Sequence, residues 1–285
     1  SLDLDFPESK IRLDERGRPL FELRGIQPCH DFPEGPDWWD LDQYKSVLSQ
    51  AAKLRMNFFG LHTYPEGRPN AEPAVWIGLP GDADENGRVK SSYSSNWQST
   101  RRNGWGYKAR NTGDFFFGAA QLFDRDDFGA EVMAGLCPKP ITPEDSNLLF
   151  NRAGEMLREA FRHARSLGIK TCVGTETPLV IPQAVKERLR KQGRDPADPA
   201  VVRELYEGIF LRAARMYAPD YYWLWTPEDC TCKPVPQPQI DATVADFRAM
   251  LAAAKKVKAP FTPATCGWVL GPPQSPALFD ESLPK

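Results

Sequence analysis

The chain has 285 residues, of which 36 are basic and 38 acidic, and its net charge is −2. This length suits one large domain, since a single α/β barrel needs about 250 residues. The balanced charge argues against a nucleic-acid-binding surface or a membrane-surface patch, so we expect a small or neutral partner. No apolar run reaches about 18 residues, and the opening SLDLDFPESK lacks a basic and an apolar stretch. We therefore expect no membrane span and no signal peptide in these residues.

The six cysteines show no spacing that is typical of a metal or redox site. One residue separates Cys230 from Cys232, whereas zinc and redox motifs separate their cysteines by two. We therefore expect reduced, mostly buried thiols, and no metal or other cofactor.

Short apolar runs alternate with helical patterns along the chain, which predicts a parallel sheet covered by helices. The five predicted strands are 21–26, 56–61, 169–174, 221–225 and 261–269. Helices are predicted over 41–54, over 148–164 with an end at Gly168, from Pro182, over 199–216 and over 239–258. Between about 65 and 147 no period is sustained, and the stretch is too long for an ordinary connection, so we expect a long functional loop insertion.

Five strand–helix units do not close an eight-stranded barrel. We therefore expect an α/β protein of the TIM-type (β/α)8 class, of which this chain supplies about the first five units. Residues 1–20 are assigned to a linker or the end of a preceding domain. Residues 21–285 are assigned to the barrel domain, which we expect to be incomplete at its C-terminal end.

Polar and aromatic side chains follow every predicted strand. Parallel α/β folds bind ligands at the carboxyl ends of their strands. Two of the three histidines, His30 and His62, follow the first two strands, and two glutamates, Glu176 and Glu228, follow the third and fourth. Each alone could be structural, with Glu176 a partner for an arginine, but four at one rim favour a functional site. Further candidates at the same strand ends are Asp31, Tyr64, Trp225, Asp229 and Trp268.

Paired carboxylates suit glycoside cleavage, because one must protonate the leaving oxygen while the other activates water or attacks the sugar. The eight tryptophans and the 11% aromatic content agree with sugar binding, since flat rings stack on sugar faces. A mixed nitrogen and oxygen metal site made by His30, Asp31, His62 and Glu176 is the alternative. Stoichiometric zinc or manganese in the purified protein would favour this metal-dependent hydrolase.

The predicted loop insertion also carries many basic residues. They are either solvated charges or, where several face the cleft, ligands for an acidic sugar such as a uronate, because arginine pairs bidentately with carboxylate. These residues are Arg68, Arg88, Lys90, Arg101, Arg102, Lys108 and Arg110.

Several segments resemble the central barrel of the bacterial α-glucuronidases and related exo-acting glycoside hydrolases. The resemblance lies in the order and spacing of Gly168-Ile169-Lys170, Thr175-Glu176-Thr177-Pro178, the Asp195–Pro199 stretch, a long helix and Asp220 to Glu228. The opening Leu23-Arg24-Gly25-Ile26 is similar to those enzymes and to the hexosaminidases. The resemblance covers residues 20–270 and implies that Glu228 is the general acid, with the general base on strands later than the fifth.

We therefore expect an exo-acting glycosidase of a carbohydrate-degrading bacterium, secreted or periplasmic, with a poly- or oligosaccharide substrate. Glu228 is expected to be the acid, with Asp229 and Glu176 the next candidates. Because Glu228 follows an apolar, aromatic strand, desolvation is expected to raise its pKa, as a general acid requires. Substrate binding is assigned to His30, Asp31, His62 and Tyr64, with Trp225 and Trp268 as stacking platforms. The alternative is a carbohydrate-binding barrel without turnover.

Overall fold

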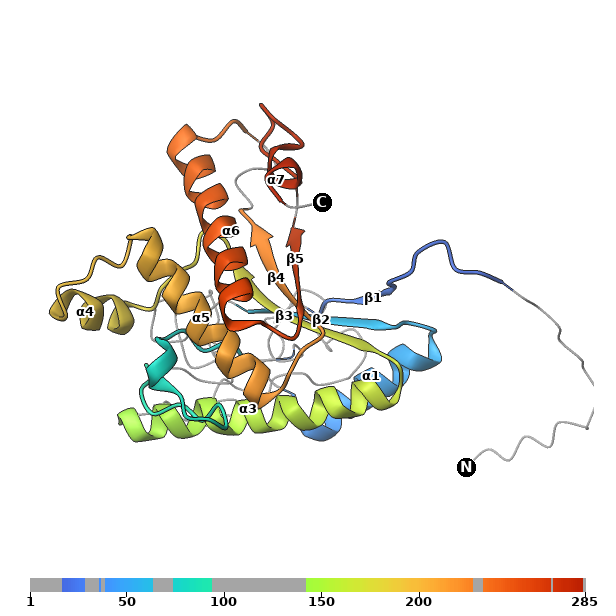
Figure 1. Cartoon of the computed structure of the whole chain (residues 1–285). Helices are drawn as coiled ribbons and strands as arrows, with labels where there is room; N and C mark the ends of the chain where they lie inside the picture. The colour runs from blue at the N-terminus through green and yellow to red at the C-terminus, as the bar shows by residue number, and fades with distance from the viewer. Residues whose placement is uncertain are drawn as a thin grey trace, which may run out of the picture.

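The computed structural model describes residues 17–28, 36, 39–63, 74–93, 142–227, 233–267 and 269–283. Five parallel strands form one sheet in chain order: β1 (Gly25–Ile26), β2 (Phe58–Thr63), β3 (Lys170–Glu176), β4 (Tyr221–Thr226) and β5 (Thr262–Gly267). Helices separate the successive strands, so the predicted parallel α/β class is confirmed (Figure 1). This order is compatible with part of a TIM-type barrel, although the described residues do not show a closed barrel.

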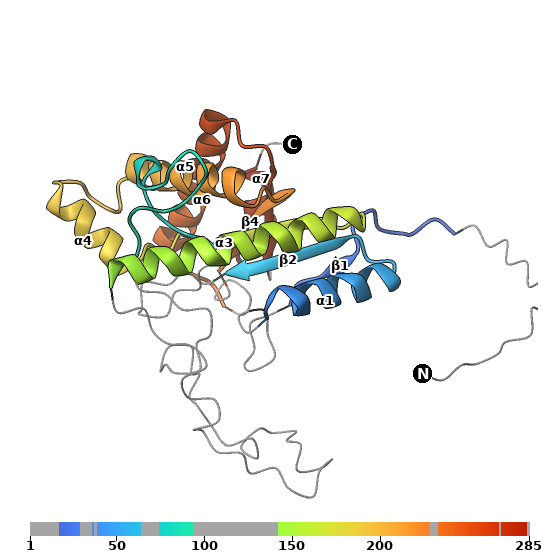
Figure 2. The same cartoon turned by 90° about the horizontal axis from the view of Figure 1, so that it is seen from below.

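The described helices are α1 (Leu41–Lys53), α3 (Pro143–Ser166), α4 (Gln183–Lys191), α5 (Pro199–Met216), α6 (Gln237–Val257) and α7 (Leu278–Glu281), with a short 3₁₀ turn, η1 (Pro80–Asp82). The long helices α1, α3, α5 and α6 cover one face of the curved sheet (Figures 1 and 2). Helix α1 packs beside α3, and α5 packs beside α6. None of the described helices is long and apolar enough to cross a membrane.

Local signals in the sequence place the ends of the longer helices. Asp40 and Thr142 form capping boxes at the starts of α1 and α3, and the Asp198 side chain caps α5, whose first residue is Pro199. These side chains satisfy backbone N–H groups that a helix start leaves without partners. Beyond α3, Gly168 has a φ of 74°, the left-handed conformation that was predicted for it.

The alternation of side chains along the strands separates two faces of the sheet. Phe59 and Leu61 of β2, Val173 of β3 and Leu224 of β4 are buried in the core with the helices. The residues between them in the sequence therefore point to the opposite, inner face of the sheet. The inner face carries the predicted site residues of β2, β3 and β4.

The Trp223 indole lies across this inner face and needs two glycines to do so. A Cβ atom on Gly60 would come within 2.1 Å of the Trp223 ring, and one on Gly174 would come within 2.0 Å of it. Phe58 packs against the same indole, with ring centroids 5.7 Å apart. Trp223 is 5% exposed, so it forms a floor beneath the strand ends.

Replacing Gly60 with alanine is expected to lower the free energy of unfolding by about 1–3 kcal/mol, because the added methyl group overlaps the buried indole. Gly81→Ala is the matched control, since a Cβ atom there would meet nothing within 4 Å. Urea unfolding of both variants measures the difference. Equal stabilities would mean that Trp223 moves aside at no cost.

Part of the predicted loop insertion packs against the core. Residues 74–93 are ordered against the core, where Trp76 is 1% exposed and donates its Nε1–H to the Ser91 carbonyl. The Tyr93 hydroxyl accepts a hydrogen bond from the Ile77 N–H. Trp76 is therefore a packing residue. Helix α3 begins at Pro143, five residues before the predicted start, because Thr142 caps it. Residues 64–73 and 94–141 lie outside the described residues.

The first predicted strand is also shorter than expected. Only Gly25–Ile26 pair with β2, while Leu20 and Phe21 are 89% and 67% exposed. Phe21 and Leu23 indicated an earlier start, but of residues 21–24 only Arg24 reaches β2 through backbone hydrogen bonds, with its carbonyl accepting the Asn57 and Phe58 N–H groups.

Candidate functional site

Three predicted site residues meet on the inner face of the sheet, at its carboxyl edge. His62 lies on β2, Glu176 is the last residue of β3, and Trp225 lies on β4. His62 pairs in register with Gly174, and Glu176 with Trp225. Residues in register on parallel strands point to the same face, so the three side chains converge.

His62 and Glu176 lie close together at the strand ends. His62 Nε2 lies 3.8 Å from Glu176 Oε1, which exceeds hydrogen-bond length but permits an electrostatic interaction when the imidazole is protonated. The His62 side chain is 3% exposed and that of Glu176 is 32% exposed. The Glu176 carboxylate is therefore accessible to solvent, and the buried His62 imidazole lies next to it.

Trp225 completes the cluster on the β4 side. Its ring centroid lies 4.4 Å from that of His62, with 43° between the planes, and 5.9 Å from the Trp223 ring in an edge-to-face arrangement. Trp225 is half-buried, whereas Trp223 is fully covered. Among the described residues, the accessible groups at this edge include a carboxylate and part of an indole, which together suit a ligand with hydroxyl groups and an apolar face.

A buried carboxyl group fixes the turn that follows Glu176. Asp246 of α6 accepts hydrogen bonds from Thr177 Oγ1 and from the Tyr206 hydroxyl, both at 2.7 Å, and the Leu179 N–H also bonds to it. The Thr177 N–H in turn donates to the Trp225 carbonyl at 2.9 Å. This network connects α6 and β4 to the residue directly after Glu176.

Burial sets the titration of this network. Asp246 is 4% exposed, and this burial raises its pKa to about 6, although the hydrogen bonds from Thr177, Tyr206 and Leu179 oppose the rise. Burial and the neighbouring Asp246 also hold the pKa of Tyr206 well above its usual range. Asp246 was not among the predicted site residues, although it is a carboxylate on the buried face of α6, between Thr243 and Phe247.

The remaining predicted site residues lie outside the described part of the chain: His30, Asp31, Tyr64, Glu228, Asp229 and Trp268. Their roles stay predictions. Among the described residues, no group of three potential metal ligands is present, and two residues of the metal alternative, His30 and Asp31, are not among them. An arginine was the structural partner suggested for Glu176 from the sequence. Among the described residues, the side chain that lies beside the Glu176 carboxylate is instead that of His62.

Arg88, one of the basic residues considered for an acidic sugar, has a structural partner. Its guanidinium donates to Glu155 of α3 at 2.6 Å, and both side chains are largely exposed. Lys90 is exposed as well, and the other five basic residues lie outside the described ranges. For Arg88 the structure gives a surface ion pair, which removes it from the set of candidate uronate ligands.

Comparisons with known proteins identify no family. No family model and no curated protein sequence matches the chain. A solved structure from Bacillus halodurans C-125, provisionally described as an α-N-acetylgalactosaminidase, is 9% identical, with a TM-score of 0.36, over 81% of this chain and 46% of that one. A GH20 catalytic module of the pneumococcal exo-β-D-N-acetylglucosaminidase is 12% identical, with a TM-score of 0.36, over 80% of this chain and 50% of that one.

The chain spans about half the length of both structures. Both are described as glycosidases, but likeness at this level establishes neither activity nor substrate. The functional proposal therefore depends on the residues at the strand ends.

Proposed function

We propose that this chain belongs to a glycoside hydrolase that cleaves a poly- or oligosaccharide. One observation carries the proposal: an accessible carboxylate, a buried imidazole and an indole converge at the carboxyl ends of three adjacent parallel strands, from Glu176, His62 and Trp225. Ligand sites of parallel α/β folds lie at this edge. Indole rings stack on the faces of sugars. Carboxyl groups catalyse the cleavage of glycosidic bonds.

The proposed division of roles uses two carboxyl groups. Glu176 accepts hydrogen bonds from sugar hydroxyls, while His62 keeps it oriented and Trp225 offers its exposed edge to the sugar ring. Glu228, which follows the last residue of β4 by two positions in the sequence, protonates the leaving oxygen. A general acid of this kind contributes roughly 10²- to 10⁴-fold to the rate.

The finer parts of the proposal are the exo-acting mode and a secreted or periplasmic location in a bacterium. Their support is the resemblance of the segments around Glu176 and Glu228 to the bacterial α-glucuronidases. The acidic-sugar variant of the proposal needs basic residues other than Arg88 in the cleft.

A panel of aryl glycosides and plant or algal glycans, offered to the full-length protein, tests this function. Hydrolysis that is lost in Glu228→Gln would support it. Saccharide binding without hydrolysis, unchanged in Glu228→Gln, would instead show a carbohydrate-binding barrel. No hydrolysis and no binding of any glycan would reject both, and dependence of hydrolysis on bound zinc or manganese would favour a metal-dependent hydrolase.

A further inference from the structure

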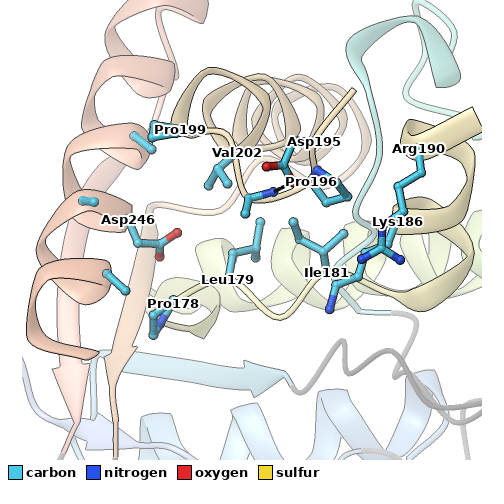
Figure 3. Close-up of a pocket in the computed structure, with 14 residues that line it drawn as sticks. Pro178, Leu179, Ile181, Lys186, Arg190, Asp195, Pro196, Pro199, Val202 and Asp246 are labelled. Atoms are coloured by element: carbon cyan, nitrogen blue, oxygen red, sulfur yellow. Dashed lines mark hydrogen bonds between the residues drawn. The ribbon is translucent and has the colours of Figure 1, made fainter. Parts of the chain in front are cut away.

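A hollow lies among the helices, beside the connection from β3 to α4 (Figure 3). Its volume is about 390 Å³. The hollow is bordered by the β3–α4 connection, α4, the turn before α5, the start of α5 and α6. This volume falls within the range of small-molecule sites, which begins at about 300 Å³. Nothing in the proposed hydrolysis uses this hollow.

The hollow has an apolar floor because α6 presents small side chains there. Ala242, Ala245 and Ala249 recur at helical spacing along the wall that α6 provides. Opposite them lie Leu179 and Ile181, which are buried, so the space between is lined by hydrocarbon.

Two cationic side chains border the floor on the side away from α6 (Figure 3). Lys186 and Arg190 stand one turn apart on α4 and therefore share a face of that helix. Among the described residues, neither side chain makes a hydrogen bond or an ion pair. Arg188 of the same helix differs, because it pairs with Asp82 and donates to Ser91.

The two carboxyl groups of the hollow are placed differently from these cations. Asp246 already accepts hydrogen bonds from Thr177, Tyr206 and Leu179, and it is 4% exposed. Asp195 is exposed at the rim, where one of its oxygens accepts the Ala197 N–H. A ligand in the hollow therefore meets two uncommitted cations beside an apolar floor.

We propose that this hollow binds a small organic carboxylate with a compact apolar body. The carboxylate pairs with Lys186 and Arg190, as charge-assisted hydrogen bonds favour. The apolar body covers Leu179, Ile181 and Ala249. The lining of this hollow differs from that of a sugar site. It contains no aromatic ring, and few of its side chains could accept a hydrogen bond from a sugar hydroxyl.

Cyclohexanecarboxylate is a suitable probe, and its amide and cyclohexylmethylamine are the neutral and cationic analogues. In amide-resolved NMR titrations of the full chain, the carboxylate is expected to shift Leu179, Ile181 and Ala249, with a Kd on the order of 1 mM. The neutral amide is expected to bind roughly fivefold more weakly. Tighter binding of the amine would overturn the proposal and assign the site to Asp195 and Asp246. Shifts located elsewhere, or none at about 20 mM probe, would also overturn it.

Three variants keep the test independent of folding. Arg190→Gln is expected to weaken carboxylate binding roughly fivefold, while Lys191→Gln, the adjacent residue that does not line the hollow, leaves it unchanged. Ala245→Phe fills the hollow from an exposed position and is expected to abolish binding. Equal binding by Arg190→Gln and Lys191→Gln would contradict the assigned role of the guanidinium.

Discussion

Replacing Glu228 with glutamine is expected to lower turnover of glycosides with poor leaving groups by roughly 10²- to 10⁴-fold, with saccharide binding nearly unchanged. Glutamine keeps the shape of the side chain and removes only the proton that a leaving oxygen needs. Glycosides with good leaving groups should lose much less activity, since their departure needs little protonation. Initial rates on a matched pair of substrates measure this difference.

The pH profile gives a second measurement of the same role. A general acid must be protonated, so the wild-type rate should fall as pH rises through the pKa of Glu228, and this limb should vanish in the variant. Asp229→Asn is the matched control at the neighbouring position, and its rate should still fall as pH rises. Near-normal turnover of a poor leaving group by Glu228→Gln would place the acid elsewhere, with Asp229 and then Glu176 as the next candidates.

The sequence predicts the parallel strands well because each is a short apolar run, but it misplaces their ends. β2 and β3 extend two residues beyond the predicted limits, to Thr63 and Glu176, and these two strands remain paired up to Thr63 and Thr175. The polar residues His62 and Glu176 thus belong to the strands themselves. A local apolar pattern cannot show this, because the pairing partner is more than 100 residues away in the sequence.

The packing of segment 74–93 could not be predicted for a related reason. Its order depends on contacts with distant helices, such as the Asn151 side chain, which accepts the Val89 N–H and donates to the Val89 carbonyl. Close approach to α5 is possible because Gly208 has no side chain, and a Cβ atom there would lie 1.9 Å from the Gly78 carbonyl oxygen. Neither contact leaves a periodic signal in residues 74–93.

Aspartate 246 is expected to make the stability of the protein fall as pH rises from about 4 to 7. The pKa of its carboxyl is about 6 in the folded chain against an ordinary value of 3.8. Between these values the folded state holds a proton that the unfolded state has lost, so stability decreases with rising pH. A difference of about two in pKa corresponds to about 3 kcal/mol, since each whole number is worth about 1.4 kcal/mol.

Comparison of the wild type with Asp246→Asn isolates this contribution, because the amide does not titrate. The free energy of unfolding of the wild type, relative to that of the variant, should drop by about 3 kcal/mol between pH 4 and pH 7 in urea titrations. Asp241→Asn, an exposed position on α6 that contacts Gln237, is the control and should show no such drop.

The hydrogen-bond donors around Asp246 supply a further check on the direction of the effect. Thr177→Val and Tyr206→Phe each remove a donor that lowers the pKa of Asp246, so either change should move the loss of stability to higher pH. Parallel pH profiles for the wild type and Asp246→Asn would show that Asp246 is charged throughout this range. The turn after Glu176 would then be held by a carboxylate across this range, and its geometry there would not depend on this proton.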